Sequence, residues 1–222
     1  MSHYRIAVFH KEYEYFCLLQ PYSETNERYY IFEPVSEDEL KESWERFHVL
    51  NPAWEYQAWI DATYQYDKAS GQYGYRYNPN AKYDYYGEVD TLEYFTLREG
   101  DSLQEDLYRK SDIDFFSDSL VKSEKALAKQ WKQLSKSGDG FYNEKYYLDR
   151  YGSEEQYIKE MRRPWIPYAF VTPDGVWHAP GTVGWFAMSD ETADKADAYW
   201  EEWKEFIENG EDCYITMLDC HI

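Results

Sequence analysis

The stretch WIPYAFVTPDGVWHAPGTVGWF, residues 165–186, contains the clearest local structural signals in the chain. Residues 166–171 form an apolar run with the length and composition of a β-strand. The Pro-Asp-Gly sequence at 173–175 predicts a tight turn, because proline fixes φ and glycine can adopt a positive φ. Residues 176–177, Val-Trp, resume an extended pattern. This stretch therefore predicts a β-hairpin.

The return half of this hairpin also has the composition of a wall for a flat ligand. Trp177, His178 and Trp185 stand close together in a segment punctuated by glycines. The alternative is that the two indoles are core residues, since large aromatic side chains dominate core packing. The sequence leaves both interpretations open.

Strand patterns stand at both ends of the chain, and helical patterns lie between them. Residues 4–10 and 214–218 predict the first and last strands. Ser36, followed three residues later by Glu39, predicts a helix that begins with a capping box. This order predicts a single α+β domain over residues 1–222, with a mainly antiparallel sheet and helices inserted between the N-terminal and C-terminal strands.

Within this domain we expect the first and last strands in one sheet, with the hairpin in or beside it. The last strand is apolar, so it needs cover on two sides and a near-central position. Apolar residues at helical spacing predict helix from 101 to 134. Ser189 followed by acidic residues predicts the N-cap of a long helix that ends near 209.

Composition limits the classes of partner. The 222 residues include 23 basic and 43 acidic side chains, a formal net charge of −20. Nucleic acids and anionic membranes are polyanions, so this charge predicts no direct nucleic-acid or membrane partner. The sequence has no run of eighteen apolar residues and no secretory signal pattern. Three unpatterned cysteines predict reduced thiols in a cytosolic protein.

The first candidate site is the polar, tyrosine-rich stretch 75–86. If residues 82–86 are extended, Lys82, Asp84 and Tyr86 share one face. A lysine is suited to a phosphate, and the carboxylate and phenol to a ribose or base. The alternative is a solvated strand face with an ion pair.

The second candidate site is the C-terminal Asp-Cys-His sequence, in which Asp219 and His221 share a face of the last strand. An oriented imidazole with a lysine and a tyrosine has the groups for metal-free phosphodiester cleavage, and a frayed tail is the alternative. No metal-site, P-loop or dinucleotide motif is present, so neither metal nor cofactor is expected. The predicted catalytic residues are His221, Asp219 and Lys82, and the predicted ligand-binding residues are Asp84, Tyr86, Trp177, His178 and Trp185.

Three motifs resemble a family of uncharacterised accessory proteins of tailed bacteriophages. Residues 78–86 fit the pattern NPxxK(W/Y)D(W/Y)Y, residues 172–185 fit TPDGxWHxxGxxGW, and residues 219–222 are DCHI. Members often continue the first motif with Gly-Gly-Arg-Trp, whereas Gly87 is followed here by Glu-Val-Asp. A basic group of the family pattern is therefore missing.

The resemblance implies a phage accessory protein that acts in the cytoplasm of the infected host cell. Phage accessory proteins of this size often counter host defence. With the aromatic, lysine and histidine candidates, this predicts a counter-defence protein that binds and sequesters, or cleaves, a small immune-signalling nucleotide of the cyclic dinucleotide or ADP-ribose type. The alternative is an acidic mimic of nucleic acid that occupies a basic surface of a host defence protein. The acidic residues are scattered over every predicted helix, which favours the pocket.

Overall fold

A computed structural model describes residues 3–11, 15–98, 107–117, 123–182 and 189–221. The chain divides into two units, unit 1 with residues 1–19 and 82–222 and unit 2 with residues 20–81. A division into compact units is not a test of the single domain expected over residues 1–222, which stays a prediction.

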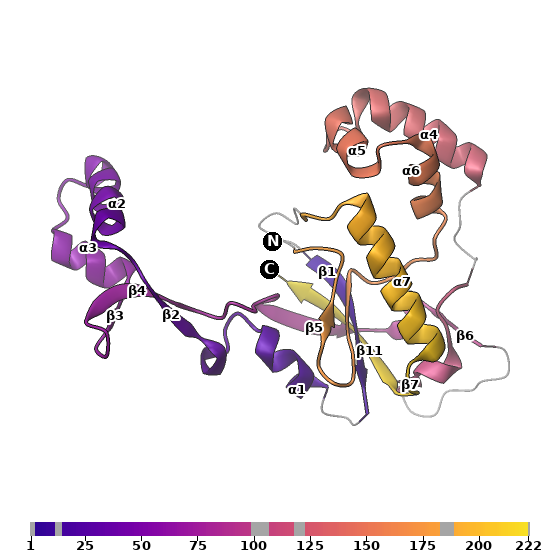
Figure 1. Cartoon of the computed structure of the whole chain (residues 1–222), viewed down its shortest axis with the longest axis horizontal. Helices are drawn as coiled ribbons and strands as arrows, with labels where there is room; N and C mark the ends of the chain where they lie inside the picture. The colour runs from indigo at the N-terminus through magenta and orange to yellow at the C-terminus, as the bar shows by residue number, and fades with distance from the viewer. Residues whose placement is uncertain (1–2, 12–14, 99–106, 118–122, 183–188, 222) are drawn as a thin grey trace. The chain divides into compact units, whose positions relative to one another are not determined.

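Unit 1 is built on a mostly antiparallel sheet, which has six strands in the described part of the chain (Figure 1). The first and last strands pair along their whole length, from His3 opposite His221 to His10 opposite Tyr214. This confirms the predicted α+β fold with paired terminal strands. The order across the sheet is β10 (Trp177–His178), β9 (Ala169–Val171), β1 (His3–His10), β11 (Tyr214–His221) and β5 (Tyr85–Val89), and β7 (Tyr108–Arg109) also pairs with β11.

The predicted hairpin is confirmed, and it belongs to this sheet. Strands β9 and β10 are antiparallel, with Trp177 opposite Val171. In the turn, Gly175 has a φ of +84°, which a residue with a side chain rarely adopts. The sheet continues through a parallel pair of β9 with β1, which leaves β11 between β1 and β5 as expected for the apolar last strand.

Helix α7 (Ala193–Asn209) crosses one face of the sheet (Figure 1). Its buried residues Tyr199, Trp203 and Ile207 pack in one core with residues of β1 and β11. The C-terminal end of α7 is held by buried Lys110, whose Nζ donates to the backbone oxygens of Phe206, Ile207 and Gly210 at 3.0, 3.2 and 2.5 Å. A cation at this end also complements the helix dipole.

Three helices, α4 (Glu124–Ser137), α5 (Glu144–Tyr151) and α6 (Glu154–Met161), form a second core within unit 1. Leu127, Trp131 and Leu134 of α4 pack there against tyrosines of α5 and α6. The remaining elements of unit 1 are short: α1 (Phe16–Leu19), η3 (Thr91–Glu93), η4 (Lys110–Asp112) and a two-stranded sheet of β6 (Thr96–Leu97) with β8 (Ile113–Asp114).

Unit 2 has its own sheet and its own small core. Leu40, Trp59, Ile60 and Tyr64 form that core. The predicted capping box is confirmed, because the Glu39 amide donates to Ser36 Oγ at 3.2 Å and the Ser36 amide donates to Glu39 Oε2 at 3.0 Å. The elements of unit 2 are η1 (Gln20–Tyr22), η2 (Glu27–Tyr29), α2 (Glu37–Leu50), α3 (Tyr56–Thr63) and a sheet in the order β2 (Ile31–Pro34), β4 (Gln72–Tyr77) and β3 (Gln65–Asp67).

Two helix predictions are wrong in part. The predicted helix from 101 to 134 contains β7, η4 and β8, and α4 begins only at Glu124. Pairing of Tyr108 and Arg109 with β11 overrides the local helical pattern there. The N-cap of α7 is Thr192 rather than Ser189, whose Oγ instead lies 3.0 Å from the Tyr168 hydroxyl. None of the helices in the described ranges is long and apolar enough to cross a membrane.

Candidate functional site

One face of the β1–β11 pair changes from apolar to polar along its length. Residues directly opposite each other in an antiparallel pair share a face, and so do alternate residues along each strand. The apolar half of this face consists of Ala7, Phe9, Ile215 and Met217, all in the core with α7. The polar half consists of His3, Arg5, Asp219 and His221.

Asp219 connects the polar half across the two strands. Its Oδ1 accepts a hydrogen bond from Arg5 Nη1, and its Oδ2 lies 3.2 Å from His3 Nδ1. Arg5 also donates through Nε to the Tyr94 hydroxyl at 2.5 Å, and its guanidinium lies over the Tyr94 ring, 5.7 Å from the centroid. The guanidinium is therefore held by a carboxylate on one side and a phenol on the other.

His221 is held by three neighbours. Its Nδ1 lies 2.8 and 2.9 Å from the two carboxylate oxygens of Asp84. Its ring stacks on Tyr85, with centroids 4.3 Å apart, and meets the His3 ring edge-on at 5.2 Å. The side chain is only 5% exposed, and Nε2 has no hydrogen-bond partner among the residues that the structure describes. A carboxylate at Nδ1 favours the proton on that nitrogen, which leaves Nε2 as an acceptor in the neutral ring.

Three of the predicted site residues thus come together, because Asp84 contacts His221 and Asp219 contacts the adjoining His3. Lys82 lies two residues before Asp84, and its carbonyl oxygen accepts a hydrogen bond from the Tyr4 hydroxyl. Tyr86 lies opposite Cys220, on the other face from His221, and its ring contacts Tyr83.

The prediction that Asp84 and Tyr86 share a face is therefore wrong. The chain bends at Asp84, and β5 begins only at Tyr85, so strand alternation does not extend back to residue 84. The bend is accompanied by a hydrogen bond from the Tyr85 amide to Asp84 Oδ1 at 2.6 Å. It lets Asp84 and Tyr85 contact His221 together.

The hairpin candidates do not join this cluster. His178 stacks on Phe170, with ring centroids 4.5 Å apart, and its Nδ1 lies 3.1 Å from Glu202 of α7. Phe170 is level with Ala7, so His178 lies in a row of the apolar half. Trp177 pairs with Val171 on the opposite face, and Trp185 lies outside the described residues.

A cavity of about 680 Å³ opens beside the polar half. His3 and Arg5 line it from β1, and Trp165 and Trp200 contribute aromatic wall. Neither Asp219 nor His221 is among its lining residues. The Trp165 ring stacks on Tyr94, with centroids 4.7 Å apart, so the aromatic wall continues to the Arg5 guanidinium.

The second arginine of the cavity, Arg163, is held in the same manner as Arg5. Its Nη2 donates to Asp197, and its guanidinium lies over the Trp200 ring, 5.5 Å from the centroid. Each cavity arginine is therefore fixed between a carboxylate and an aromatic ring. Such planar groups are oriented before a ligand arrives, which reduces the entropy lost on binding.

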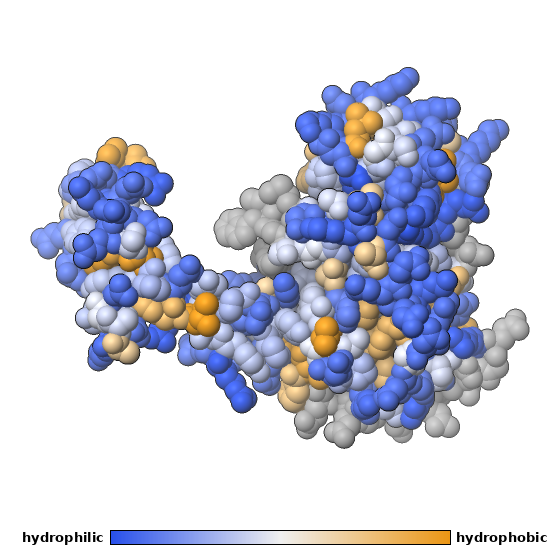
Figure 2. Space-filling view, viewed as in Figure 1, coloured by the Kyte–Doolittle hydropathy of each residue, from blue (hydrophilic) through white to orange (hydrophobic). Residues whose placement is uncertain are grey.

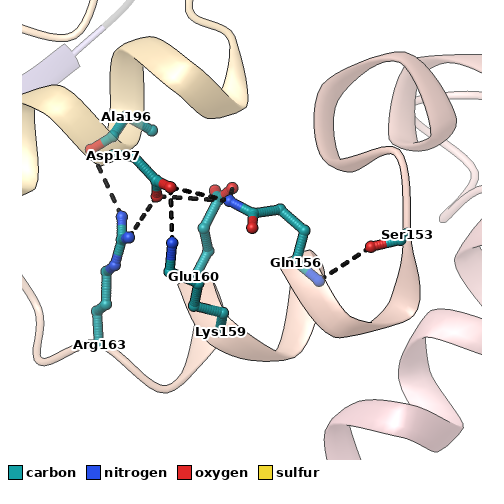
Figure 3. A network of polar contacts seen from close by, with 7 residues as sticks. All are labelled: Ser153, Gln156, Lys159, Glu160, Arg163, Ala196 and Asp197. Atoms are coloured by element: carbon teal, nitrogen blue, oxygen red, sulfur yellow. Dashed lines mark hydrogen bonds and ion pairs between the residues drawn. The ribbon is translucent and has the colours of Figure 1, made fainter.

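A polar network between α6 and α7 fixes this part of the cavity wall (Figure 3). Asp197 accepts from Lys159 Nζ at 2.7 Å, from Arg163 and from Gln156 Nε2 at 3.4 Å. Burial opposes ionisation of Asp197, but the hydrogen bonds from Lys159 and Arg163 outweigh it and lower the pKa of this carboxyl. Burial raises the pKa of the neighbouring Glu160, which lines the cavity.

Sequence reasoning missed the cavity residues Arg5, Tyr94, Arg163, Trp165 and Trp200. Arg163 lies in a sequence that reads as a helix stop, and Trp200 in one that reads as an apolar helix stripe. The available signal was that Arg5 shares a face of the first strand with Ala7 and Phe9, since a charge on the core-facing side of a strand is unusual.

The described residues form no cluster that indicates a metal centre. In the part of the chain that the structure describes, no group of three or more His, Cys, Asp or Glu side chains is arranged to hold a metal ion. Comparisons with protein-family models, curated proteins and solved structures found no match. The resemblance to phage accessory proteins therefore stays a prediction that depends on three motifs.

Proposed function

We propose that this chain binds and sequesters a small nucleotide in the cavity beside the polar half, as a phage counter-defence protein in the infected cell. The observation that carries the binding proposal is the pair of fixed arginines at an aromatic cavity. The cavity of about 680 Å³ lies within the range of small-molecule sites, roughly 300–1,000 Å³. The biological setting is supported by the motif resemblance.

The cavity has groups for both parts of a nucleotide. Guanidinium groups form paired hydrogen bonds with phosphate, and Arg5 and Arg163 supply two of them. Trp165 and Trp200 offer ring faces on which a base can stack. A nucleotide spanning these groups would be held at both ends.

The charge of the whole chain does not exclude an anionic ligand here. Among the described residues, two arginines and His3 line the cavity together with two acidic residues, Glu160 and Glu191. Glu191 is paired with Arg150 at 2.6 Å, and the pKa of Glu160 is raised by burial. Charges beyond about 8 Å are largely screened at physiological ionic strength. Asp219 and Asp197 pair with the two arginines, lie well within this distance and offset their charge. A ligand in the cavity therefore meets surroundings that are near neutral rather than strongly negative.

We favour sequestration over cleavage because the two imidazoles are unequally accessible. Metal-free cleavage needs one group that accepts a proton and another that donates one at the reacting atoms. His3 lines the cavity, but His221 is buried and lies outside the lining. The Asp84–His221 pair therefore acts in this proposal as support for His3.

The test is calorimetric titration of the protein with a panel of cyclic dinucleotides and ADP-ribose-type signals. Replacing Trp165 with alanine should weaken binding about tenfold to a hundredfold, because stacking on an aromatic ring contributes about 1–3 kcal/mol per base. Trp54→Ala is the matched control, since the two indoles are 40% and 44% exposed and Trp54 belongs to unit 2. It should leave the affinity unchanged.

Heat release of the ligand, followed by mass spectrometry, separates the two activities. Recovery of intact nucleotide supports sequestration. Recovery of linear products from wild type but not from His3→Ala would instead support hydrolysis. If no panel member binds at micromolar protein, the pocket proposal fails and the acidic mimic of nucleic acid takes its place.

A further inference from the structure

Helix α4 presents an unusual row of positive charge. Its buried side consists of Leu127, Trp131 and Leu134. Its exposed side includes four lysines spaced i, i+4, i+7 and i+11, which fall on one stripe of a helix with 3.6 residues per turn. This lysine stripe consists of Lys125, Lys129, Lys132 and Lys136.

No described residue neutralises the lysine stripe. None of its four ammonium groups forms an ion pair or a hydrogen bond with the residues that the structure describes. The only acidic residue of α4 is Glu124, which pairs with Arg162. In an ordinary solvated helix face, acidic and basic residues alternate and pair. Here the positive charges are left together.

The region around α4 differs in charge from the rest of the chain. Residues 123–163, which contain α4, α5 and α6, have nine basic and seven acidic side chains, whereas the whole chain has 23 and 43. The surface of these helices is mainly hydrophilic (Figure 2). Because charges beyond about 8 Å are screened at physiological ionic strength, a partner at α4 meets this local charge rather than the net charge of the chain.

Exposed aromatic rings follow the lysine stripe at the C-terminal end of α4. Phe141 is 83% exposed, and the Tyr146 ring stacks on Tyr142 with centroids 4.1 Å apart. Asp139 Oδ1 accepts the backbone N–H groups of Phe141 and Tyr142 at 2.9 and 2.8 Å, which orders the loop. An ordered loop therefore carries a large apolar ring to the surface.

We propose that the lysine stripe and this aromatic loop bind a single-stranded nucleic acid, DNA or RNA. Lysines along a groove or ridge neutralise the sugar-phosphate backbone, and aromatic rings stack on its unpaired bases. Eleven residues of helix span about 16 Å, enough for several consecutive phosphates. This proposal is independent of the nucleotide cavity, and it departs from the expectation based on net charge.

An anionic membrane fits the lysine stripe less well. Helices that lie in a membrane interface place apolar residues beside the basic ones and insert them between the lipids. The apolar residues of α4 are instead buried against α5 and α6. The ring of Phe141 provides one exposed apolar group, which is suited to stacking on a base.

The test is fluorescence anisotropy of a labelled 20-nucleotide oligothymidylate with the full chain at several salt concentrations. Four neutralised phosphates on a single strand give a slope of log K against log salt of about −3. The affinity should therefore fall about fiftyfold between 50 and 200 mM salt. Replacing any one lysine of the stripe with glutamine should reduce the slope by about 0.7.

Replacing all four lysines of the stripe with glutamine should abolish binding at 50 mM salt. The matched control replaces four other exposed lysines with glutamine, namely Lys11, Lys41, Lys68 and Lys204, and so changes the net charge by the same amount. It should retain the affinity and the slope. Phe141→Ala should weaken binding about tenfold and leave the slope unchanged, because it removes stacking and no charge.

The proposal is overturned if the oligothymidylate does not bind at 50 mM salt, or if the stripe and control variants lose the same amount of affinity. It is also overturned if the protein binds a duplex of the same length, or phosphatidylserine vesicles, more tightly than the single strand. Melting curves by circular dichroism check that the variants are folded. If the fourfold variant does not fold, the single-lysine slopes and Phe141→Ala decide the question, and unchanged slopes and affinity would count against it.

Discussion

The apolar and polar halves of the β1–β11 face share two strands and one continuous register, but they differ in what lies against them. Ala7, Phe9 and their partners are buried with the aromatic side chains of α7. Arg5 and His3, on the same face of the same strand, line a cavity instead. Burial of apolar surface is the main stabilising contribution in a fold. We infer that the apolar half determines stability and that His3 and Arg5 of the polar half are available for binding.

The largest expected effect is in the apolar half. Trp203 is fully buried, and its ring contacts Phe9 and Phe170 at centroid distances of 5.8 and 5.4 Å. Trp203→Ala should lower the free energy of unfolding by about 3–5 kcal/mol, because it removes a large buried side chain and leaves a cavity. Urea denaturation measures the change. A loss below about 1 kcal/mol would show that α7 does not form the main core.

The second effect concerns the anchor of α7 above the apolar half. Lys110→Met replaces the aliphatic stem of lysine with another unbranched chain, but it removes the ammonium donor shared by three carbonyl oxygens at the end of α7. Leaving buried acceptors unpaired typically costs about 1–3 kcal/mol. The same denaturation experiment should give a loss in this range. An unchanged midpoint would mean that water replaces the ammonium group without penalty.

The network beside the cavity should give a smaller effect that depends on pH. The pKa of Asp197 is lowered in the folded protein, so its contribution is present above the unfolded-state value, about 3.9, and is lost as the pH falls through the folded-state value. Asp197→Asn should therefore lower stability by about 1 kcal/mol at pH 7 and by less below pH 4. Thermal melting of wild type and variant at pH 7 and at a pH below 4 measures this difference in stability. A difference independent of pH would contradict it.

Glu160 should show the opposite dependence on pH. Burial raises its pKa, so the folded state binds the proton more tightly, and stability falls as the pH rises from the unfolded-state value, about 4.3, through the raised value. Glu160→Gln removes this penalty and should raise stability at neutral pH by less than about 1 kcal/mol. Melting across pH 4 to 8 measures the effect, and a variant less stable than wild type at pH 7 would contradict it.

Sequence patterns predicted the parts of the fold that local signals specify. The Pro-Asp-Gly turn, the capping box at Ser36 and the apolar last strand each have a local physical cause, and each forms as expected. The helix expected from 101 to 134 was wrong over 108–114, because pairing with β11 is a long-range interaction that a local pattern does not contain. Ser189 Oγ accepts a hydrogen bond from the Glu191 amide at 3.1 Å and also lies 3.0 Å from the Tyr168 hydroxyl. The contact with Tyr168, from another segment, is likewise absent from a local pattern.

Only part of the candidate site could be predicted from the sequence. Asp84, Asp219 and His221 belong to motifs near the ends of paired strands, so their proximity follows from the pairing of β5 with β11. Tyr86 fell on the wrong face because the bend at Asp84 is set by contacts to residue 221, more than a hundred positions away. Arg163 follows the end of α6 and Trp200 lies in α7, so only the tertiary packing of these two segments reveals that they meet.

The most direct test that the cavity arginines bind a ligand rather than stabilise the fold is calorimetric titration of the nucleotide panel into Arg5→Lys and Arg163→Lys, with urea denaturation of the same samples. Lysine keeps the charge but loses the planar fork that a carboxylate and an aromatic ring hold in place. The predicted result is binding weakened about tenfold or more in each variant, with unfolding free energies within about 1 kcal/mol of wild type. Wild-type affinity in both variants, or a loss of stability as large as that of Trp203→Ala, would contradict it.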